Sequence, residues 1–201
     1  MQTARRVLLL PGAGGDREFW SPVAQRLPAA WEKIALSWPG LGDQAHDHSV
    51  RGLDDLVARA AAALATPSDL IAQSMGGVVA VHIAARYPEQ VRRLVLVASS
   101  GGFDPAAHDA EDWRQDYRRT YPDAADWITE PVPDQGPEIA RITASTLLVW
   151  GDSDPISPIS VGIKLAKALP DARLRVVEGG THDLARDHSE VIAPWIIEHL
   201  S

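Results

Sequence analysis

The sequence has 201 residues, enough for one domain with a substantial apolar core but few for two. Hydrophobic residues make up 45% of the chain and charged residues 23%, which is ordinary for a globular protein. The formal net charge of -8 argues against nucleic acid and against an anionic membrane surface, because binding to either needs clustered lysine and arginine. Cysteine is absent, so disulfides, thiolate metal sites and a cysteine nucleophile are excluded.

The N-terminal residues carry no pattern typical of export. Two arginines are followed by an apolar run of only four residues, at 7–10, which is too short for a signal peptide or a membrane span. We therefore expect a cytoplasmic protein in which this run forms the first strand.

Along the chain, short apolar runs alternate with segments of helical periodicity. This alternation predicts a parallel sheet with helices on both of its faces. The expected strands are residues 5–10, 32–37, 68–72, 93–98, 146–150 and 174–177. The expected helices are residues 19–27, 53–65, 75–86, 160–168 and 189–199.

The first expected strand runs into a glycine-rich loop, residues 11–15, which reads Pro-Gly-Ala-Gly-Gly. A dinucleotide-binding loop is disfavoured because Arg17 occupies the position of that pattern's third glycine. A phosphate loop is disfavoured as well, because no Gly-Lys-Ser/Thr follows. The remaining alternatives are a flexible turn and a loop that directs a backbone N–H toward an active site.

The third expected strand joins its helix through residues 72–76, which read Ala-Gln-Ser-Met-Gly. A serine at a sharp strand-to-helix turn, with small residues two positions before and after it, is the pattern of a nucleophile elbow. Such a turn would expose the hydroxyl of Ser74 and direct the N–H of Met75 toward a substrate oxygen. The alternative is an ordinary turn in which Ser74 caps the helix.

A serine nucleophile needs a base to accept its proton and an acid to orient that base. The fifth expected strand ends in Gly-Asp-Ser-Asp-Pro, which contains Asp152 and Asp154, and the sixth ends in a loop that contains His182. Both loops follow the carboxyl ends of strands, where ligands bind in open parallel sheets. The sequence therefore predicts that these side chains meet Ser74 at one edge of the sheet.

Five stretches together carry a resemblance to a known family. They are residues 11–15, residues 38–42 (Trp-Pro-Gly-Leu-Gly), the elbow at 72–76, residues 151–158, and residues 180–182. From residue 7 to residue 200 the chain resembles the α/β-hydrolase superfamily, in its compact lipase/esterase-like branch. Three positions depart from the common pattern: Pro11 stands where histidine is usual, Asp43 where serine is usual, and Ala72 where glycine is usual.

The resemblance implies an α/β-hydrolase fold in a single domain over residues 1–201. Its mostly parallel sheet would have about six strands, with helices on both faces. In this fold a cap covers the active site from the position of the charged, aromatic-containing segment here, so we expect a short lid at about residues 100–143. Trp113 and Trp127 are candidates to line the substrate pocket, although both also suit an anchoring role.

The resemblance also implies roles for individual residues. Gly151, Asp154 and Pro158 match the family's Gly-x-x-Asp-x-x-x-Pro run, which favours Asp154 over Asp152 as the acid. Asp104, after the fourth strand, is a further rival. The expected triad is Ser74, Asp154 and His182, and the expected oxyanion donors are the N–H groups of Met75 and Ala13.

The predicted activity is hydrolysis of a small carboxylic ester through an acyl-enzyme. Alternatives with the same residues are a lyase, a carbon–carbon bond hydrolase, a perhydrolase, or a non-catalytic small-molecule receptor. No cofactor is expected. A metal site at His46, Asp47 and His48 is disfavoured, because His-x-His patterns in loops are usually solvated. The expected partner is a small ester-like molecule, with no nucleic acid and no membrane, while the oligomeric state stays open.

Overall fold

The computed structural model describes residues 5–201. Within them, six strands form one sheet in the order β2-β1-β3-β4-β5-β6, and every neighbouring pair is parallel. The strands are β1 (Arg6–Leu10), β2 (Glu32–Ala35), β3 (Ser68–Gln73), β4 (Val91–Val97), β5 (Ser145–Gly151) and β6 (Ala172–Val177). The six predicted strands are therefore confirmed, although most strand ends are shifted by one or two residues.

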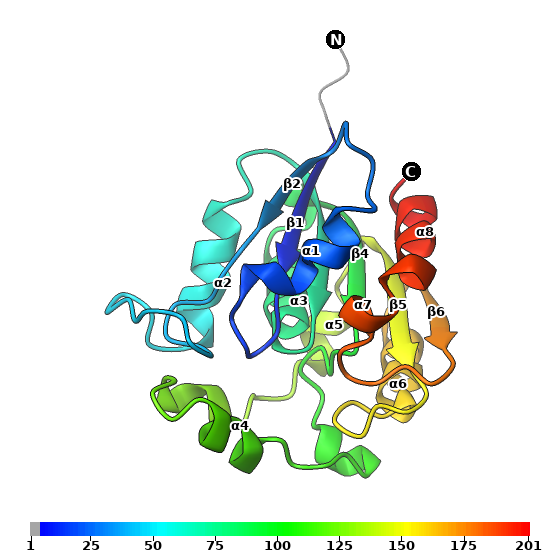
Figure 1. Cartoon of the computed structure of the whole chain (residues 1–201). Coiled ribbons are helices and arrows are strands. Elements are labelled where there is room, and N and C mark those ends of the chain that lie inside the picture. The colour runs from blue at the N-terminus through cyan, green and yellow to red at the C-terminus, as the bar shows by residue number, and fades with distance from the viewer. Residues whose placement is uncertain (1–4) are drawn as a thin grey trace.

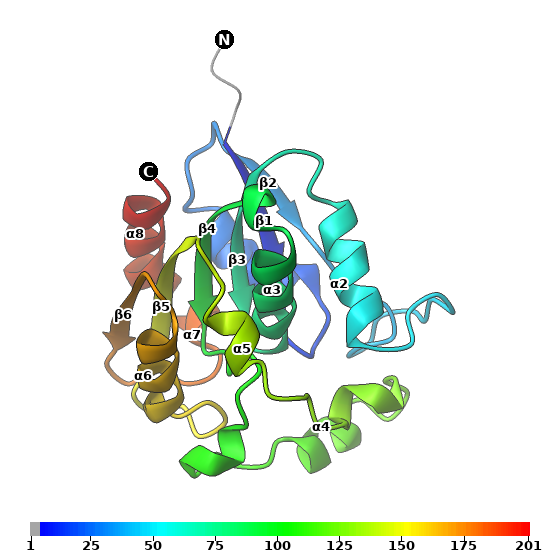
Figure 2. The ribbon, with the colours of Figure 1, turned by 180° about the vertical axis from the view of Figure 1, so that it is seen from behind.

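Helices cover both faces of the sheet, which confirms the predicted fold class (Figures 1 and 2). One face carries α2 (Leu53–Ala62), α3 (Met75–Arg86), α5 (Gly136–Ile139) and α6 (Ile159–Ala168). The other carries α1 (Ser21–Ala24), α7 (Leu184–Asp187) and α8 (Ser189–Leu200). The longest of these have 12 residues, and no helix within residues 5–201 is long and apolar enough to cross a membrane.

The sheet divides the interior into two cores, and β1, next to the edge strand β2, contributes side chains to both. Leu8 and Leu10 point into the core beneath α2, α3 and α6, while Val7 and Leu9 point into the core beneath α1, α7 and α8. All four side chains are fully buried. Because successive side chains of a strand face opposite sides, a strand covered on both faces must be apolar at every position. This requirement accounts for the unbroken apolar run in the sequence.

The prediction of one helix over residues 19–27 is wrong. The chain instead forms a 3-10 turn, η1 (Arg17–Trp20), followed by the four-residue helix α1. Pro22 accounts for the break, because proline has no N–H to donate and is tolerated only in the first turn of a helix. A helix that began at residue 19 would place Pro22 beyond that first turn, so a new helix begins at Ser21 instead.

The chain between β4 and β5 extends beyond the carboxyl edge of the sheet (green in Figure 1). It contains the 3-10 turns η3 (Pro105–His108) and η4 (Asp126–Thr129), and the helix α4 (Arg114–Thr120) between them. Gln135 closes the base of this excursion, because its N–H donates to the carbonyl oxygen of Gly102 at 3.3 Å. We call residues 103–134 the excursion, and its function as a lid stays a prediction.

Candidate active site

Ser74 lies at the turn between β3 and α3 with a φ angle of 52°, in the left-handed region that non-glycine residues rarely adopt. Two glycines make this turn sterically possible. A β-carbon on Gly76 would lie 2.3 Å from the carbonyl oxygen of Pro11, and one on Gly77 would lie 2.1 Å from the hydroxyl of Ser99. Ser74 makes no side-chain capping bond to the helix. The geometry is therefore that of the elbow and not of a helix cap.

His182 lies in the loop after β6 and joins residues from the two other loops. Its Nε2 atom is 3.0 Å from the hydroxyl oxygen of Ser74, and its Nδ1 atom is 2.9 Å from Oδ2 of Asp154. The imidazole is partly accessible to solvent, with 19% of the side chain exposed, whereas the Asp154 side chain is fully buried. The structure thus brings together three side chains that are distant in sequence.

The surroundings of Asp154 determine how protons are arranged along this chain of hydrogen bonds. Its Oδ1 atom accepts hydrogen bonds from the backbone N–H groups of Ile156 and Ser157, each at 2.9 Å. Oδ2 is left to accept the Nδ1 proton of His182. In the neutral imidazole, Nε2 is then unprotonated and can accept the proton of the Ser74 hydroxyl.

The two rival acids are bonded elsewhere. Asp152 accepts hydrogen bonds from the N–H of Gly179 at 2.7 Å and from the Ser153 hydroxyl at 3.0 Å, and it is exposed. Asp104 accepts from the N–H of Ala106 at 3.0 Å and caps η3. Asp152 therefore shapes the turn, and Asp154 is the carboxylate paired with His182.

The predicted oxyanion donors belong to two segments that touch. Met75 is the first residue of α3, where an N–H has no intrahelical acceptor and lies at the positive end of the helix dipole. The loop that contains Ala13 packs on the elbow, since a β-carbon on Gly12 would lie 3.1 Å from Cβ of Ser74. The indole N–H of Trp38 donates to the carbonyl oxygen of Pro11 at 2.7 Å and so fastens this loop. The oxyanion roles themselves stay predictions.

Sequence reasoning missed two side chains that hold the elbow in place. The amide Nε2 of Gln73 donates to the carbonyl oxygen of His182 at 3.3 Å. The hydroxyl of Ser99 donates to the carbonyl oxygen of Ser74 at 2.6 Å. Gln73 was visible as the neighbour of Ser74, and Ser99 as a residue just after β4, but neither position by itself indicates the bond.

The two tryptophans proposed for the pocket lie in the excursion, partly buried against the core that contains α2, α3 and α6. The ring of Trp113 meets the ring of Tyr117 edge-on at 5.4 Å, and Nε1 of Trp127 is buried with no hydrogen-bond partner among residues 5–201. The ring contact of Trp113 suits the anchoring role, as does the packing of both side chains against the core, and the pocket role stays a prediction.

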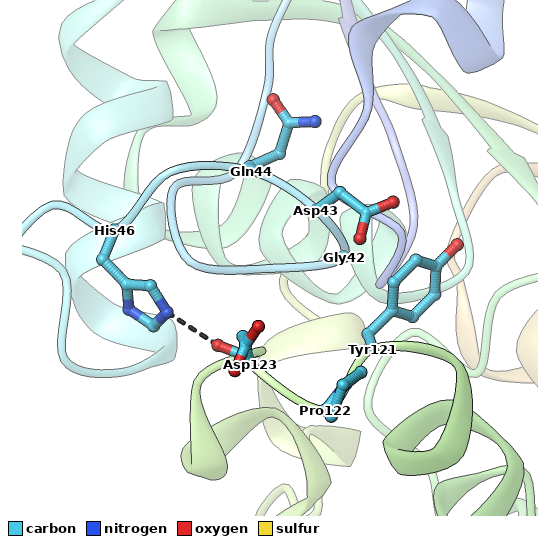
Figure 3. A pocket seen from close by; sticks show the side chains of 7 residues that line it. All are labelled: Gly42, Asp43, Gln44, His46, Tyr121, Pro122 and Asp123. Atoms are coloured by element: carbon cyan, nitrogen blue, oxygen red, sulfur yellow. Dashed lines mark hydrogen bonds between the residues drawn. The ribbon is translucent and has the colours of Figure 1, made fainter.

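Two cavities lie near the excursion. One of about 150 Å³ separates the loop after β2 from the turn after α4 (Figure 3), and its lining is Gly42, Asp43, Gln44, His46, Tyr121, Pro122 and Asp123. A larger one of about 610 Å³ lies against α2 and α3, where His82 and Arg86 contribute to its lining. Ser74 lines neither, so the candidate site is located by its hydrogen bonds and not by these cavities.

Two of the three residues considered for a metal site, His46 and Asp47, have other partners. His46 Nε2 bonds to the carbonyl oxygen of Asp123 at 2.8 Å, as drawn in Figure 3, and Asp47 pairs with Ser49 and Arg59. Within residues 5–201, no three histidine or carboxylate side chains lie so that they could hold a metal ion.

A family model described as an alpha/beta hydrolase family matches residues 7–130, and one described as TAP-like protein matches residues 111–201. The chain belongs to the alpha/beta hydrolase family. Among curated relatives, pimeloyl-[acyl-carrier protein] methyl ester esterase from Neisseria meningitidis is 30% identical, over 94% of this chain and 91% of that protein. A 2-hydroxy-6-oxononadienedioate/2-hydroxy-6-oxononatrienedioate hydrolase from Escherichia coli is 22% identical, over 95% of this chain and 84% of that protein.

Solved structures agree with the fold of this α/β hydrolase. A hydrolase from Pseudomonas aeruginosa superposes with a TM-score of 0.81 at 18% identity, and the match covers all of this chain and 91% of that one. A meta-cleavage product hydrolase from Pseudomonas fluorescens has a TM-score of 0.77 at 18% identity, over 97% of this chain and 90% of that one. The chain is thus an enzyme of the α/β-hydrolase class with a parallel six-stranded sheet.

Proposed function

We propose that this α/β hydrolase cleaves a small carboxylic ester through an acyl-enzyme formed on Ser74. The observation that carries the proposal is the hydrogen-bonded series from the Ser74 hydroxyl to His182 Nε2, at 3.0 Å, and from His182 Nδ1 to Asp154, at 2.9 Å. This is the arrangement in which a serine is activated by a base whose tautomer a buried carboxylate fixes.

The reaction proceeds in two halves. Ser74 Oγ attacks the carbonyl carbon of the ester while its proton moves to His182 Nε2, and the N–H groups of Met75 and Ala13 stabilise the oxyanion. His182 then gives that proton to the departing alkoxide, which leaves as the alcohol. Water attacks the acyl-enzyme with His182 again as the base, and the carboxylic acid leaves as Ser74 regains its proton.

Three observations bear on the substrate. The relative from Neisseria meningitidis, whose name describes an esterase of a pimeloyl-[acyl-carrier protein] methyl ester, aligns over nearly the whole of both chains and supports an ester. The excursion that we propose as the lid holds only one α-helix, α4, beyond the sheet edge, which leaves little wall for a long acyl chain. Residues 98–144 carry ten acidic and four basic side chains, a formal charge of -6, which favours neutral esters over anionic ones.

Carbon–carbon bond hydrolysis is the second candidate. The Escherichia coli relative carries the name of a 2-hydroxy-6-oxononadienedioate/2-hydroxy-6-oxononatrienedioate hydrolase. The same serine, histidine and aspartate could serve such a reaction, so the substrate panel has to separate the two. A non-catalytic receptor is disfavoured because the three side chains are present and hydrogen-bonded.

The experiment compares the wild type with Ser74→Ala on p-nitrophenyl and methyl esters of increasing acyl length, together with one 2-hydroxy-6-oxo-dienoate. We expect turnover of short esters and a loss of at least about 10³-fold in kcat in the variant. Ser153→Ala, an exposed serine on the neighbouring loop, is the matched control. Turnover of the dienoate alone would favour the second candidate, and equal ester activity in Ser74→Ala would refute both.

A further inference from the structure

The hydroxyl group of Tyr117 joins the excursion to two loops of the body. It donates a hydrogen bond to the carbonyl oxygen of Ala13 at 2.8 Å and accepts one from the backbone N–H of Gly42 at 2.9 Å. Tyr117 belongs to α4 and is 8% exposed, so these bonds lie out of solvent. A single buried oxygen therefore connects the excursion, the glycine-rich loop and the loop after β2.

The two loops fit together at this point with no spare room. A β-carbon on Gly42 would lie 2.1 Å from the carbonyl oxygen of Gly14, and one on Gly15 would lie 2.7 Å from that of Leu41. Gly42 and Gly15 also have positive φ angles, 54° and 70°, which glycine adopts most readily. Tyr117 is bonded where the two backbones meet, and so it opposes rotation of the peptide group between Ala13 and Gly14 away from this packing.

Rotation of that peptide group would matter for the reaction. The N–H of an oxyanion donor has to point at the place where charge develops, and the backbone angles of Ala13 relate its carbonyl to its N–H. We propose that Tyr117 is a positioning residue, which holds Ala13 so that its N–H faces the oxyanion and thereby couples the seating of the lid to the oxyanion hole. The inference rests on the proposed function, in which Ala13 is a donor.

The phenol is suited to this role because it keeps its proton. Burial raises the pKa of Tyr117 above its ordinary value of 10.0, so the hydroxyl remains a donor throughout the pH range in which such enzymes are assayed. Its ring packs edge-on against Trp113 and at 5.0 Å from Tyr121, and these contacts do not depend on the oxygen. Removal of the oxygen alone therefore leaves the ring contacts of Tyr117 in place.

The test is Tyr117→Phe. We expect kcat for the best ester to fall by about 10- to 100-fold, since a displaced catalytic group can cost about 10²-fold, with little change in KM. The affinity for an alkyl boronic acid, which forms a tetrahedral adduct on the serine, should fall by a similar factor. The melting temperature should fall by a few degrees, because the buried N–H of Gly42 loses its acceptor while the ring and its contacts remain.

His46→Ala is the matched control, because it also removes a hydrogen bond between the excursion and the body. The imidazole of His46 bonds to the carbonyl oxygen of Asp123 (Figure 3), whereas the Tyr117 hydroxyl bonds to that of Ala13. We expect this variant to keep the boronic acid affinity of the wild type. Equal losses in both variants would show that anchoring of the excursion, and not the position of Ala13, is what Tyr117 provides, and would overturn the inference.

The same series separates this inference from the proposed function. A wild type that hydrolyses no ester and is not labelled at Ser74 by a fluorophosphonate would refute the proposed function, and the inference with it. A wild type that is active and labelled, with a Tyr117→Phe variant of unchanged kcat and boronic acid affinity, would refute the inference alone.

Discussion

A β-carbon on Gly76 would lie 2.3 Å from the carbonyl oxygen of Pro11, so the nucleophile elbow and the glycine-rich loop touch backbone to backbone. The contact joins the two segments that carry the proposed oxyanion donors, Met75 and Ala13. The separation of those donors is thus set by main-chain packing and not by an intervening side chain.

Gly76→Ala should therefore damage both activity and stability. The added methyl group has to push the elbow and the loop apart, and we expect kcat/KM for esters to fall by about 100-fold. Overpacking of this kind costs about 1–3 kcal/mol in the free energy of unfolding. Ester kinetics and urea denaturation measure the two effects.

Gly52→Ala is the control for this substitution. Nothing lies within 4 Å of a β-carbon at Gly52, and its φ angle of 178° is extended backbone that any residue adopts. We expect wild-type kinetics and a change in stability within about 0.5 kcal/mol. Wild-type kinetics in Gly76→Ala as well would show that this main-chain contact does not set the oxyanion hole.

Asp154→Asn should lower kcat by about 10³- to 10⁴-fold. The asparagine oxygen would still accept the N–H groups of Ile156 and Ser157, which leaves its NH₂ group facing Nδ1 of His182. Nδ1 would then have to accept, so the proton would move to Nε2 and block proton transfer from Ser74. Steady-state kinetics on the best ester give the loss.

Asp152→Asn provides the comparison, because its amide oxygen can still accept the N–H of Gly179. We expect kcat close to that of the wild type. A large loss in Asp152→Asn with a small one in Asp154→Asn would exchange the roles of the two carboxylates.

The protein should lose stability on acidification below pH about 6.5. Burial lowers the pKa of His82 and of His199, and the nearby Arg86 and Arg93 respectively lower it further. Each imidazole then binds its proton more readily in the unfolded chain, so the contribution is complete above the ordinary pKa of 6.5 and is lost as the pH falls through the lowered folded values. Asp69 opposes the loss at lower pH, because burial raises its pKa above 3.8.

Urea denaturation at pH 5, 6, 7 and 8 measures this dependence. Nδ1 of His82 is buried with no hydrogen-bond partner among residues 5–201, so His82→Gln removes the buried imidazole without breaking a bond at that atom. We expect a smaller decline between pH 7 and pH 5 in His82→Gln than in the wild type. The exposed His48→Gln is the control for loss of an imidazole, and an equal decline in all three proteins would contradict the assignment.

The acidic excursion should discriminate between substrates by charge. At low salt we expect kcat/KM for the dimethyl ester of a dicarboxylic acid to exceed that for its anionic monomethyl ester by about tenfold. The ratio should shrink at about 1 M salt, where charges are screened beyond about 3 Å. A combined Asp109→Asn, Glu111→Gln, Glu130→Gln variant should also shrink it, and a salt-independent ratio would show that the preference has another cause.

The sequence contains most of what determines the sheet and the three central side chains. Apolar runs buried on both faces identify the strands, and parallel strands present the loops that follow them at one edge, so Ser74, His182 and an aspartate of the loop after β5 could be matched from their places after strands. The choice of Asp154 over Asp152 came from the family resemblance. The helix α3 is found at its predicted bounds, 75–86, because its ends carry strong local signals.

Contacts between distant segments were beyond the reach of such reasoning. Tyr117 reads as one aromatic residue of a helical stripe, and nothing local indicates that its oxygen reaches Ala13, which is 104 positions away in sequence. The hydrogen bond from Gln73 to His182 spans 109 positions, and no local pattern in the sequence indicates it either. The wrong prediction of a helix over residues 19–27 has a local cause. Pro22 is visible in the sequence, and it is incompatible with a helix that begins at residue 19.

The hydrogen bond from Gln135 to Gly102 has a consequence for how enzymes of this kind diversify. Because it ties both ends of the excursion together, residues 103–134 leave and rejoin the body at one place, so we expect another segment to be able to replace them while the strands, Ser74, Asp154 and His182 stay in place. Selection for new substrates can act on this one exchangeable segment. A replacement segment must still supply a group that holds Ala13, as we propose for Tyr117. A change of specificity therefore requires a new contact to the proposed oxyanion hole.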